Sequence, residues 1–276
     1  MICTTVIFSV QDGLSRYLAE EYNVMMIVMI RYWFFAMFVT AISSRRAGGL
    51  PKVAVSANPW LQVARGLLLV ADVCVMVLAF IMLGLAESHA IFAVYPLMVA
   101  ALSFAILGEQ VGWRRWVAIA VGFVGVLIIL QPGAGVFSAS AFLPLIAAFM
   151  FALYTLLTRL VARKDKAETS FFWTGITGAI AMTFVGPFFW QNLQGTDWWL
   201  MLGLCLTGSI GHYILIKAYE AAAPTVVQPF SFLQLVFVSA IGFTIFDEPF
   251  EITIAIGAVL ILGSGLFTLW RERVRA

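Results

Sequence analysis

Apolar stretches alternate with short polar connections along the whole chain. Ten of these stretches approach the roughly 20 residues that an α-helix needs to cross the hydrocarbon core of a bilayer. They cover residues 2–19, 23–43, 60–83, 87–108, 113–131, 138–161, 170–190, 196–218, 225–247 and 251–270. The first is the least apolar, because Gln11, Asp12 and Arg16 interrupt it. The pattern predicts an all-α polytopic membrane protein with ten transmembrane helices.

Basic residues gather in alternate connections and in the C-terminal tail. Twelve of the sixteen Lys and Arg residues lie there: Arg45, Arg46, Lys52, Arg114, Arg115, Arg159, Arg163, Lys164, Lys166, Arg271, Arg273 and Arg275. The intervening connections are acidic, with Arg16 the only basic residue beside them. Because basic connections stay on the cytoplasmic side of a membrane, we expect both termini in the cytoplasm and an even number of spans. We expect a multi-pass protein of the bacterial inner membrane.

Composition agrees with a membrane protein. The chain is 63% hydrophobic and 11% charged, with a mean hydropathy of +1.01, whereas a soluble domain carries about 25% charged residues. The net charge of +2 belongs to the connections and forms no basic stripe, so we expect no nucleic-acid partner. Cys3, Cys74 and Cys205 have no metal or disulfide spacing and are interpreted as packing residues. We expect no metal and no cofactor.

The two halves of the chain match one another weakly. Residues 79–130 align with 218–269 without a gap, so that Phe104 meets Phe243 and Glu109 meets Glu248. The order of the matches pairs the first five stretches with the last five. Because five is odd, the halves would cross the membrane in opposite directions, as in transporters built from inverted repeats. We expect two five-helix repeats, in residues 1–131 and 138–276.

Short motifs in both halves carry a resemblance to a known family. They are the run from Ala218 to Phe230, Phe246-Asp247-Glu248-Pro249 and Gly263-Ser264-Gly265-Leu266, with looser counterparts at Arg31, Tyr95-Pro96 and Leu107-Gly108-Glu109. In these features the chain resembles the drug/metabolite transporter superfamily, EamA type. It is similar to the YddG-type exporters of aromatic amino acids, and also to members thought to move S-adenosylmethionine inward. The resemblance implies ten helices, a central cavity and alternating access, although Asp247 stands where the family usually has glycine.

Ionisable residues within apolar stretches are expensive in hydrocarbon and therefore point to sites. The repeat places Asp72 at the depth of Gly211, beside His212, so both side chains should face one interface. There they would bind a substrate ammonium group or carry a proton. The alternative is a structural hydrogen bond between helices.

Two prolines mark corresponding positions in the repeats. Pro96 follows His89, and Pro229 follows Gln228, the repeat equivalent of His89. Proline frees backbone carbonyls in the preceding turn, and at membrane depth these must find partners or line a polar cavity. The alternative is an ordinary kink in which a nearby serine, Ser88 or Ser231, satisfies the backbone.

The remaining polar residues divide into cavity candidates and paired charges. We expect Asp12 to pair with Arg16 or Arg31, Arg65 and Lys217 to extend toward the membrane surface, and Glu109 and Glu248 to cap or brace two gates. Aromatic residues around the cavity would suit flat or cationic substrates. Our substrate-binding set is Gln11, Asp72, His89, Tyr95, Tyr154, His212, Gln228 and Gln234.

These features favour a secondary transporter that exports aromatic or other neutral amino acids. Two alternatives of the same fold are an importer of a metabolite such as S-adenosylmethionine and a drug exporter. A distant alternative is an intramembrane enzyme built on Ser209 and His212, but these residues have no orienting acid nearby and match no nucleophile motif. We expect a small-molecule substrate, a lipid environment and a functional monomer, because one chain contains both halves.

Overall fold

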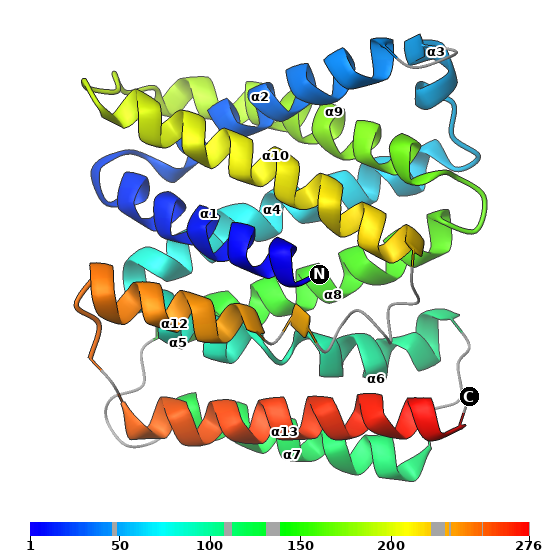
Figure 1. The fold of residues 1–276 in the computed structure, drawn as a ribbon, viewed down its shortest axis with the longest axis vertical. Coiled ribbons are helices and arrows are strands. Elements are labelled where there is room, and N and C mark those ends of the chain that lie inside the picture. Colours follow the sequence, from blue (N-terminus) through cyan, green and yellow to red (C-terminus); the bar gives the residue numbers. More distant parts are fainter. Residues whose placement is uncertain are drawn as a thin grey trace.

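The computed structural model describes residues 1–45, 49–107, 112–130, 139–221, 230–231, 233–249 and 251–275, and in these it is a stack of long helices (Figure 1). The first half contains α1 (Ile2–Glu21), α2 (Val24–Ser44), α3 (Gly49–Ala54), α4 (Pro59–Leu83), α5 (Leu85–Phe92), α6 (Tyr95–Leu107) and α7 (Trp113–Leu130). The second half contains η1 (Ala139–Ala141), α8 (Phe142–Val161), α9 (Ala167–Val185), η2 (Gly186–Phe189), α10 (Asp197–Ala221), α12 (Leu233–Ile245) and α13 (Ile252–Arg275).

Helix covers part or all of every predicted apolar stretch. Six helical segments among the described residues are long and apolar enough to cross a membrane, one of which, Leu85–Ser103, runs through α5 into α6. Three shorter apolar helices lie at Trp116–Ile129, Leu233–Ile245 and Ile252–Phe267. The first helix, α1, is not one of the six, since Asp12 and Arg16 interrupt its apolar sequence. The all-helical membrane architecture is therefore confirmed at the level of the helices, and the count of ten crossings stays a prediction.

The predicted stretch 87–108 is divided by a turn. The helix α5 ends at Phe92 and α6 begins at Tyr95, immediately before Pro96. The backbone itself closes this turn, with the N–H of Ala93 donating to the carbonyl of His89 at 2.9 Å. Ser88 does not satisfy the break, because its hydroxyl finds no hydrogen-bond partner among the described residues.

The connection after α2 contains a short helix, α3, over residues Gly49–Ala54. Gly49 has φ +60, a left-handed value that glycine adopts without steric strain, and Pro51 lies in the first turn, where a missing N–H is tolerated. A glycine and a proline therefore begin this helix instead of making a bare turn.

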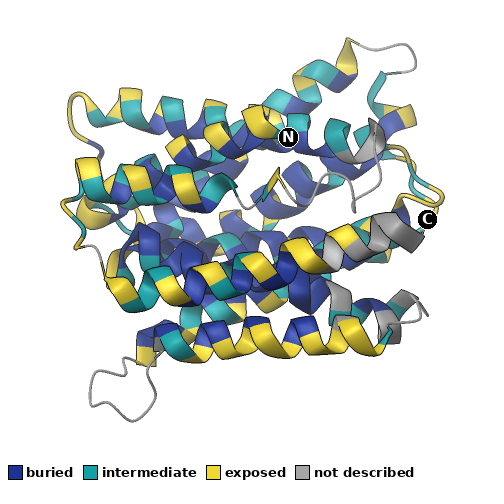
Figure 2. Ribbon diagram, turned by 60° about the horizontal axis from the view of Figure 1, so that its bottom comes forward, coloured by how far each residue is buried: buried dark blue, intermediate teal, exposed yellow. Residues whose placement is uncertain are grey.

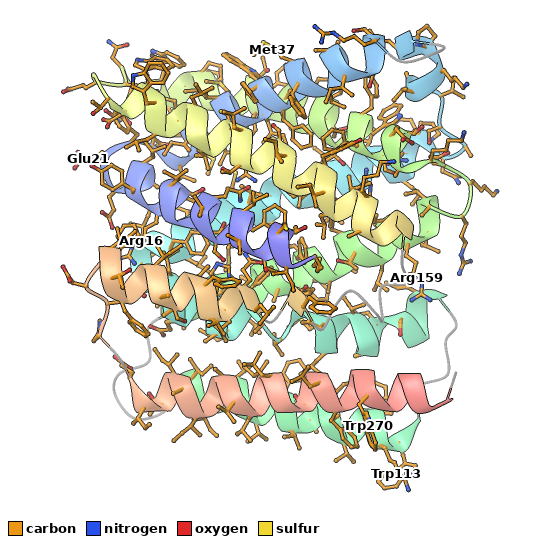
Figure 3. All side chains as sticks on the ribbon, in the orientation of Figure 1. Arg16, Glu21, Met37, Trp113, Arg159 and Trp270 are labelled. Atoms are coloured by element: carbon orange, nitrogen blue, oxygen red, sulfur yellow. The ribbon has the colours of Figure 1, made fainter. Side chains whose placement is uncertain are left out.

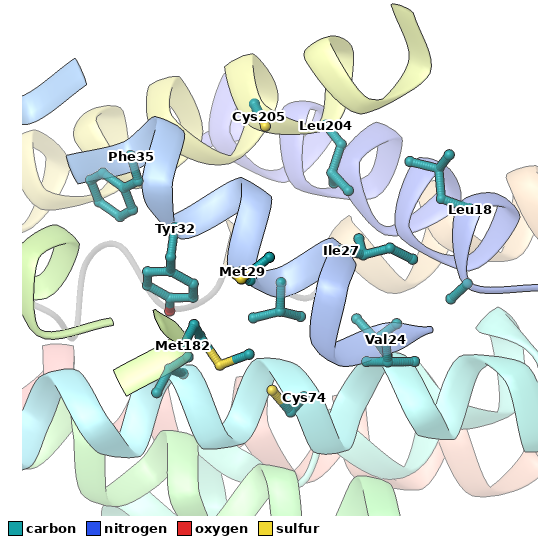
Figure 4. Close-up of a cluster of buried hydrophobic side chains, with 14 of the residues drawn as sticks. Leu18, Val24, Ile27, Met29, Tyr32, Phe35, Cys74, Met182, Leu204 and Cys205 are labelled. Atoms are coloured by element: carbon teal, nitrogen blue, oxygen red, sulfur yellow. The ribbon is translucent and has the colours of Figure 1, made fainter. Parts of the chain in front are cut away.

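Buried apolar residues form two cores. The first is built mainly by α1, α2, α4, α9 and α10, and Figure 4 shows part of it around Tyr32. Cys74 and Cys205 are buried in it, as expected for packing residues. The second is built mainly by α5, α6, α7, α12 and α13, and α8 contributes to both. Each core thus mixes helices from both halves of the sequence.

The most closely packed helix pairs join the two halves. They include α4 with α8, α2 with α9, α1 with α10, and α7 with α13, the adjacent lower pair in Figure 1. Gly125 and Gly257 permit the last pairing, because a Cβ built on Gly125 would lie 2.7 Å from the carbonyl oxygen of Gly257. The halves are therefore interleaved and are not two bodies side by side.

The outer faces of the helices carry exposed apolar side chains. On α7 they include Val121, Val124 and Leu127, and on α13 they include Val259; exposed residues follow the outward faces in Figure 2. Side chains project from the whole outline of the molecule in Figure 3, with Met37 and the tryptophans of α7 and α13 among those labelled. Such a surface suits lipid, since an apolar face of this extent is unusual on a soluble monomer.

Candidate substrate cavity

A cavity of about 100 Å³ lies between the two cores. One wall comes from α1, α2, α4 and α10, and the other from α5, α6, α8 and α12. Its polar lining is contributed by both halves of the chain: Thr5, Gln11, Asp12, Arg31, Asp72, His89, Tyr95, His212, Ser231 and Gln234. Met1 lines one end.

The structure brings together most of the residues expected from the sequence. Six members of the set line this one cavity: Gln11, Asp72, His89, Tyr95, His212 and Gln234. Gln228 lies outside the described residues. Tyr154 does not line the cavity and instead contacts Arg65. The geometry thus gathers the six residues, while their role in substrate binding stays a prediction.

Asp12 lies at the centre of a polar network. Its carboxylate accepts hydrogen bonds from Nε2 of Gln234 at 2.9 Å and from Nε2 of Gln11 at 3.3 Å. Nε2 of His89 lies 3.1 Å from Oδ2 of Asp12 but is not aligned for a hydrogen bond. The expected pairing of Asp12 with an arginine is therefore wrong, because a histidine and two amides from α1, α5 and α12 surround the carboxylate.

Arg31 approaches the cavity from α2. Its Nη2 donates to Oε1 of Gln11 at 3.2 Å. Gly208 on α10 makes room for the guanidinium, because a Cβ built there would lie 2.9 Å from Nε of Arg31. Within the described part of the chain, no carboxylate lies within 4 Å of this guanidinium.

Asp72 and His212 face the same cavity, as the repeat predicted. Their exposed fractions are 5% and 6%. Neither Oδ1 of Asp72 nor Nδ1 of His212 has a hydrogen-bond partner among the described residues. A buried polar atom left without a partner costs about 1–3 kcal/mol, so these two atoms favour the binding of a molecule that supplies the missing partners.

Aromatic rings enclose the polar groups. The ring of His212 lies 5.1 Å from Phe8, centroid to centroid, and His89 stacks on Phe80 at 5.3 Å and 20°. Tyr95 meets Phe151 edge to face at 4.9 Å. The sequence interpretation expected Tyr95 in this wall and missed the four cavity phenylalanines: Phe8, Phe80, Phe92 and Phe151. A phenylalanine in a membrane helix gives no sequence signal that separates a cavity wall from a lipid contact.

A second buried polar cluster surrounds Arg65, which is completely buried. Its guanidinium donates to Gln62, to the hydroxyls of Tyr154, Thr158 and Thr174, and to the carbonyl of Ser170. The expectation that Arg65 extends toward the membrane surface is therefore wrong: polar groups from α4, α8 and α9 satisfy it inside the protein. Lys217 differs from Arg65: its side chain is 38% exposed, and it forms an ion pair with Glu168 at 3.1 Å.

Glu248 closes one end of the helix stack. Its carboxylate accepts hydrogen bonds from the N–H groups of Leu85 and Ala86, at 2.6 and 2.9 Å, and forms an ion pair with Arg16. A carboxylate at a helix N-terminus satisfies free N–H groups and interacts favourably with the helix dipole. Glu248 thus caps α5 and braces α1. Its expected role at a gate stays a prediction, and Glu109 lies outside the described residues.

The residue before Glu248 explains a family preference. Asp247 has φ 50, in the left-handed region. Glycine is best suited to this region, and aspartate is among the few other residues that enter it readily. The replacement of the family's usual glycine by Asp247 therefore keeps the turn that presents Glu248 to α5.

Ser209 and His212, the pair considered for an intramembrane enzyme, are not hydrogen-bonded to each other. The hydroxyl of Ser209 is buried and makes no hydrogen bond with any residue that the structure describes, so His212 does not activate it. No group of three or more His, Cys, Asp or Glu residues suited to a metal ion occurs in the described ranges.

Comparison with known families identifies the fold. The model of the EamA-like transporter family matches residues 1–131 and 138–270. The chain belongs to the EamA-like transporter family. It is therefore a small-molecule transporter and a multi-pass membrane protein. The resemblance drawn from its motifs is confirmed over the whole chain.

Named relatives of this EamA-like chain fall into two groups. It is 24% identical over 272 residues to the S-adenosylmethionine uptake transporter of Rickettsia prowazekii, covering 99% of this chain and 92% of the relative. It is 30% identical over 224 residues to the riboflavin transporter of Rhizobium johnstonii, covering 79% and 72%. A solved crystal structure with 16% identity superposes with a TM-score of 0.66 over 99% of both chains, which shows a shared fold.

Proposed function

We propose that this transporter imports a metabolite of the S-adenosylmethionine class by alternating access. The observation that carries the proposal is a cavity in which the carboxylates of Asp12 and Asp72 lie among aromatic rings. S-adenosylmethionine has a sulfonium cation and a flat adenine ring, which suit a carboxylate and an aromatic wall. Four S-adenosylmethionine uptake transporters, each aligned over at least 96% of this chain, support the same reading.

Riboflavin is the second candidate. The relative of 30% identity favours it, and the aromatic wall would stack on its ring system. Riboflavin is neutral, however, and would leave the charges of Asp72 and Arg31 without a partner inside the protein. A charged substrate therefore fits the cavity better than riboflavin does. Export of amino acids, the function first expected from the motifs, has less support than import, because the named relatives move other metabolites.

The proposed motion follows the two cores. Because the halves are interleaved, the two cores are the natural rigid units for this motion, with the cavity between them. Arg16 and Glu248 join the units at one end. The charge pattern assigns the acidic connection that contains Glu248 to the outside, so the form described here would be closed on that side. We further propose ten spans in two inverted repeats, an inner-membrane location and a functional monomer. The family model matches residues 1–131 and 138–270 separately, which supports a division into two repeats.

Counterflow in proteoliposomes tests the substrate. Vesicles loaded with unlabelled S-adenosylmethionine, riboflavin or phenylalanine would be exposed to a trace of the same labelled compound. We expect accelerated uptake only with S-adenosylmethionine on both sides. Exchange of riboflavin alone would establish the second candidate, and exchange of phenylalanine alone would restore amino-acid transport. Absence of exchange for all three, from protein shown to be folded, would contradict the proposed substrates.

A further inference from the structure

Arg31 is a buried cation with little compensation from the protein. Its exposed fraction is 5%. A guanidinium has five N–H donors, and the hydrogen bond that this one makes goes to the neutral amide of Gln11 at 3.2 Å. A buried charge is normally paired or extensively hydrogen-bonded, because removing it from water is costly. Among the described residues, Arg31 therefore has no ionic partner of the kind that a buried, permanently charged side chain normally has.

The two nearby carboxylates do not supply this partner. Asp12 and Asp72 line the same cavity, yet across the described residues no carboxylate oxygen lies within 4 Å of Arg31. Asp12 is engaged by His89 and two glutamines. Asp72 keeps one oxygen without a hydrogen bond. One cavity thus presents a guanidinium and a carboxyl group that make no direct contact with each other within the described residues.

We propose that Arg31 is the receptor for a carboxylate of the transported molecule, while Asp72 receives its cationic part. The planar fork of a guanidinium matches a carboxylate with two parallel hydrogen bonds. The substrate class is then a zwitterion that carries an amino-acid head group and an aromatic body. This inference rests on the proposed function and narrows it: it includes S-adenosylmethionine and excludes riboflavin.

The neighbours of Arg31 hold it for this task. Gln11 ties the guanidinium to the network of Asp12, because one amide accepts from Arg31 and donates to Asp12. Gly208, on α10, has no side chain, and this leaves the space that the guanidinium of Arg31 occupies. A methyl group there would lie 2.9 Å from Nε, so Gly208→Ala displaces Arg31 without removing its charge.

Matched ligand pairs test the assignment. Each pair would contain a carboxylated molecule and its decarboxylated analogue: S-adenosylmethionine with decarboxylated S-adenosylmethionine, and tryptophan with tryptamine. Binding to the purified protein in detergent would be measured by ligand-induced thermal stabilisation, and transport by inhibition of counterflow. For at least one pair we expect the wild type to prefer the carboxylated member by roughly tenfold or more, as for a charge-assisted hydrogen-bonded pair.

Variants separate the carboxylate contact from a structural role. We expect Arg31→Gln to abolish the preference and Arg31→Lys to keep part of it, since lysine retains the charge and loses the fork. Arg45→Gln, at an exposed arginine after α2, is the matched control and should keep the full preference. If Arg31→Gln fails to fold, Gly208→Ala provides the same comparison with the arginine present.

The outcomes distinguish this inference from the proposed function. A preference for tryptophan over tryptamine that depends on Arg31, without any response to S-adenosylmethionine, would retain the carboxylate receptor and reject the proposed metabolite. If the protein transports S-adenosylmethionine, and Arg31→Gln prefers the carboxylated ligands as strongly as the wild type, the proposed metabolite is retained and the role of Arg31 as carboxylate receptor is rejected. Equal binding of both members of every pair by the wild type would also overturn the assignment.

Discussion

Two buried arginines in this transporter have opposite surroundings. Arg65 donates to a carbonyl, an amide and three hydroxyls from α4, α8 and α9, whereas Arg31 donates to one amide at the edge of a cavity. The carboxylate of Asp165 compensates the charge of Arg65 through Gln62, which donates to it at 2.8 Å. The same residue type is thus fully hydrogen-bonded in one place and, in our proposal, a substrate-binding group in the other.

The contrast extends to the whole of each cluster. Around Arg65, Gln62 and Ser170 are buried and hydrogen-bonded to one another at 3.2 Å. Around the cavity, Asp72 and His212 keep buried atoms without partners among the described residues. A satisfied network fixes helices in place, while an unsatisfied one stores the affinity for a ligand. Hydrogen-bond saturation therefore separates scaffold from site here better than burial does.

The largest expected effect is on folding. Arg65→Met leaves several buried acceptors without a donor, and we expect a loss of about 2–5 kcal/mol of stability. The melting temperature in detergent and the folded yield would measure it. Arg31→Gln is the matched control and should lose much less, since one hydrogen bond disappears. Equal destabilisation by the two variants would break the comparison.

The next effect is on transport without loss of folding. Asp72→Asn removes the charge that would receive a cationic substrate, and we expect roughly a tenfold or larger fall in counterflow at a normal melting temperature. His212→Ala should reduce transport in the same way, since its Nδ1 faces the cavity without a protein partner. Glu20→Gln, at an exposed carboxylate, is the control. Counterflow at the wild-type rate in both Asp72→Asn and His212→Ala would contradict the assignment of these residues to the substrate site.

A smaller effect is expected at the closed end. Glu248→Gln keeps the size of the cap on α5 and weakens its charge-assisted bonds to Arg16, Leu85 and Ala86. The outside should then open more often. A cysteine placed at cavity residue Val73, in a background without Cys3, Cys74 and Cys205, should react severalfold faster with an impermeant thiol reagent added outside. An unchanged rate would show that Glu248 does not hold this end shut.

The smallest expected effect is the pH dependence of folding stability at Asp165, in the hydrogen-bonded cluster around Arg65. Burial by itself raises the pKa of the Asp165 carboxyl, but hydrogen bonds from Ser56, the N–H of Ala57 and Gln62, with the nearby charge of Arg65, outweigh it and hold the pKa below its usual value. The carboxylate therefore stabilises the fold fully above the ordinary aspartate pKa of about 4, and this contribution is lost as pH falls through the lowered pKa.

Melting temperatures of the wild type and Asp165→Asn test this pH dependence. Their difference should be constant from pH 7 to about 5 and should shrink on further acidification. A difference that grows in acid would mean that the folded protein binds the proton more tightly than the unfolded chain, which is the opposite of the stated direction.

The sequence predicted the helices better than their partners. Long apolar stretches locate α2 or α4 because the membrane imposes their length. Pro96 indicated the break that separates α5 from α6 just before Tyr95. The partners of Arg65 come from α8 and α9, about 90 to 110 residues away, and no local pattern reveals them. Position near a helix end therefore suggested the membrane surface for a side chain that is completely enclosed.

The sequence predicted those residues of the candidate site that are polar and lie within otherwise apolar helices. Asp72 and His212 stand out in apolar helices, and the repeat placed them on one interface. The phenylalanines of the cavity and the neighbours of Asp12 depend on how α1, α5 and α12 pack. That packing arises from the interleaving of the halves, which the order of the repeats along the chain does not indicate.

Interleaving also has a consequence for synthesis of the chain. The helices α1, α2 and α4 pack chiefly on α10, α9 and α8, all of which are translated after residue 141. During synthesis the N-terminal helices therefore enter the membrane before most of their packing surfaces exist, with buried polar residues such as Arg65 still without partners. Folding of this transporter must be largely post-insertional, and its early helices depend on lipid and insertion machinery until the second half arrives.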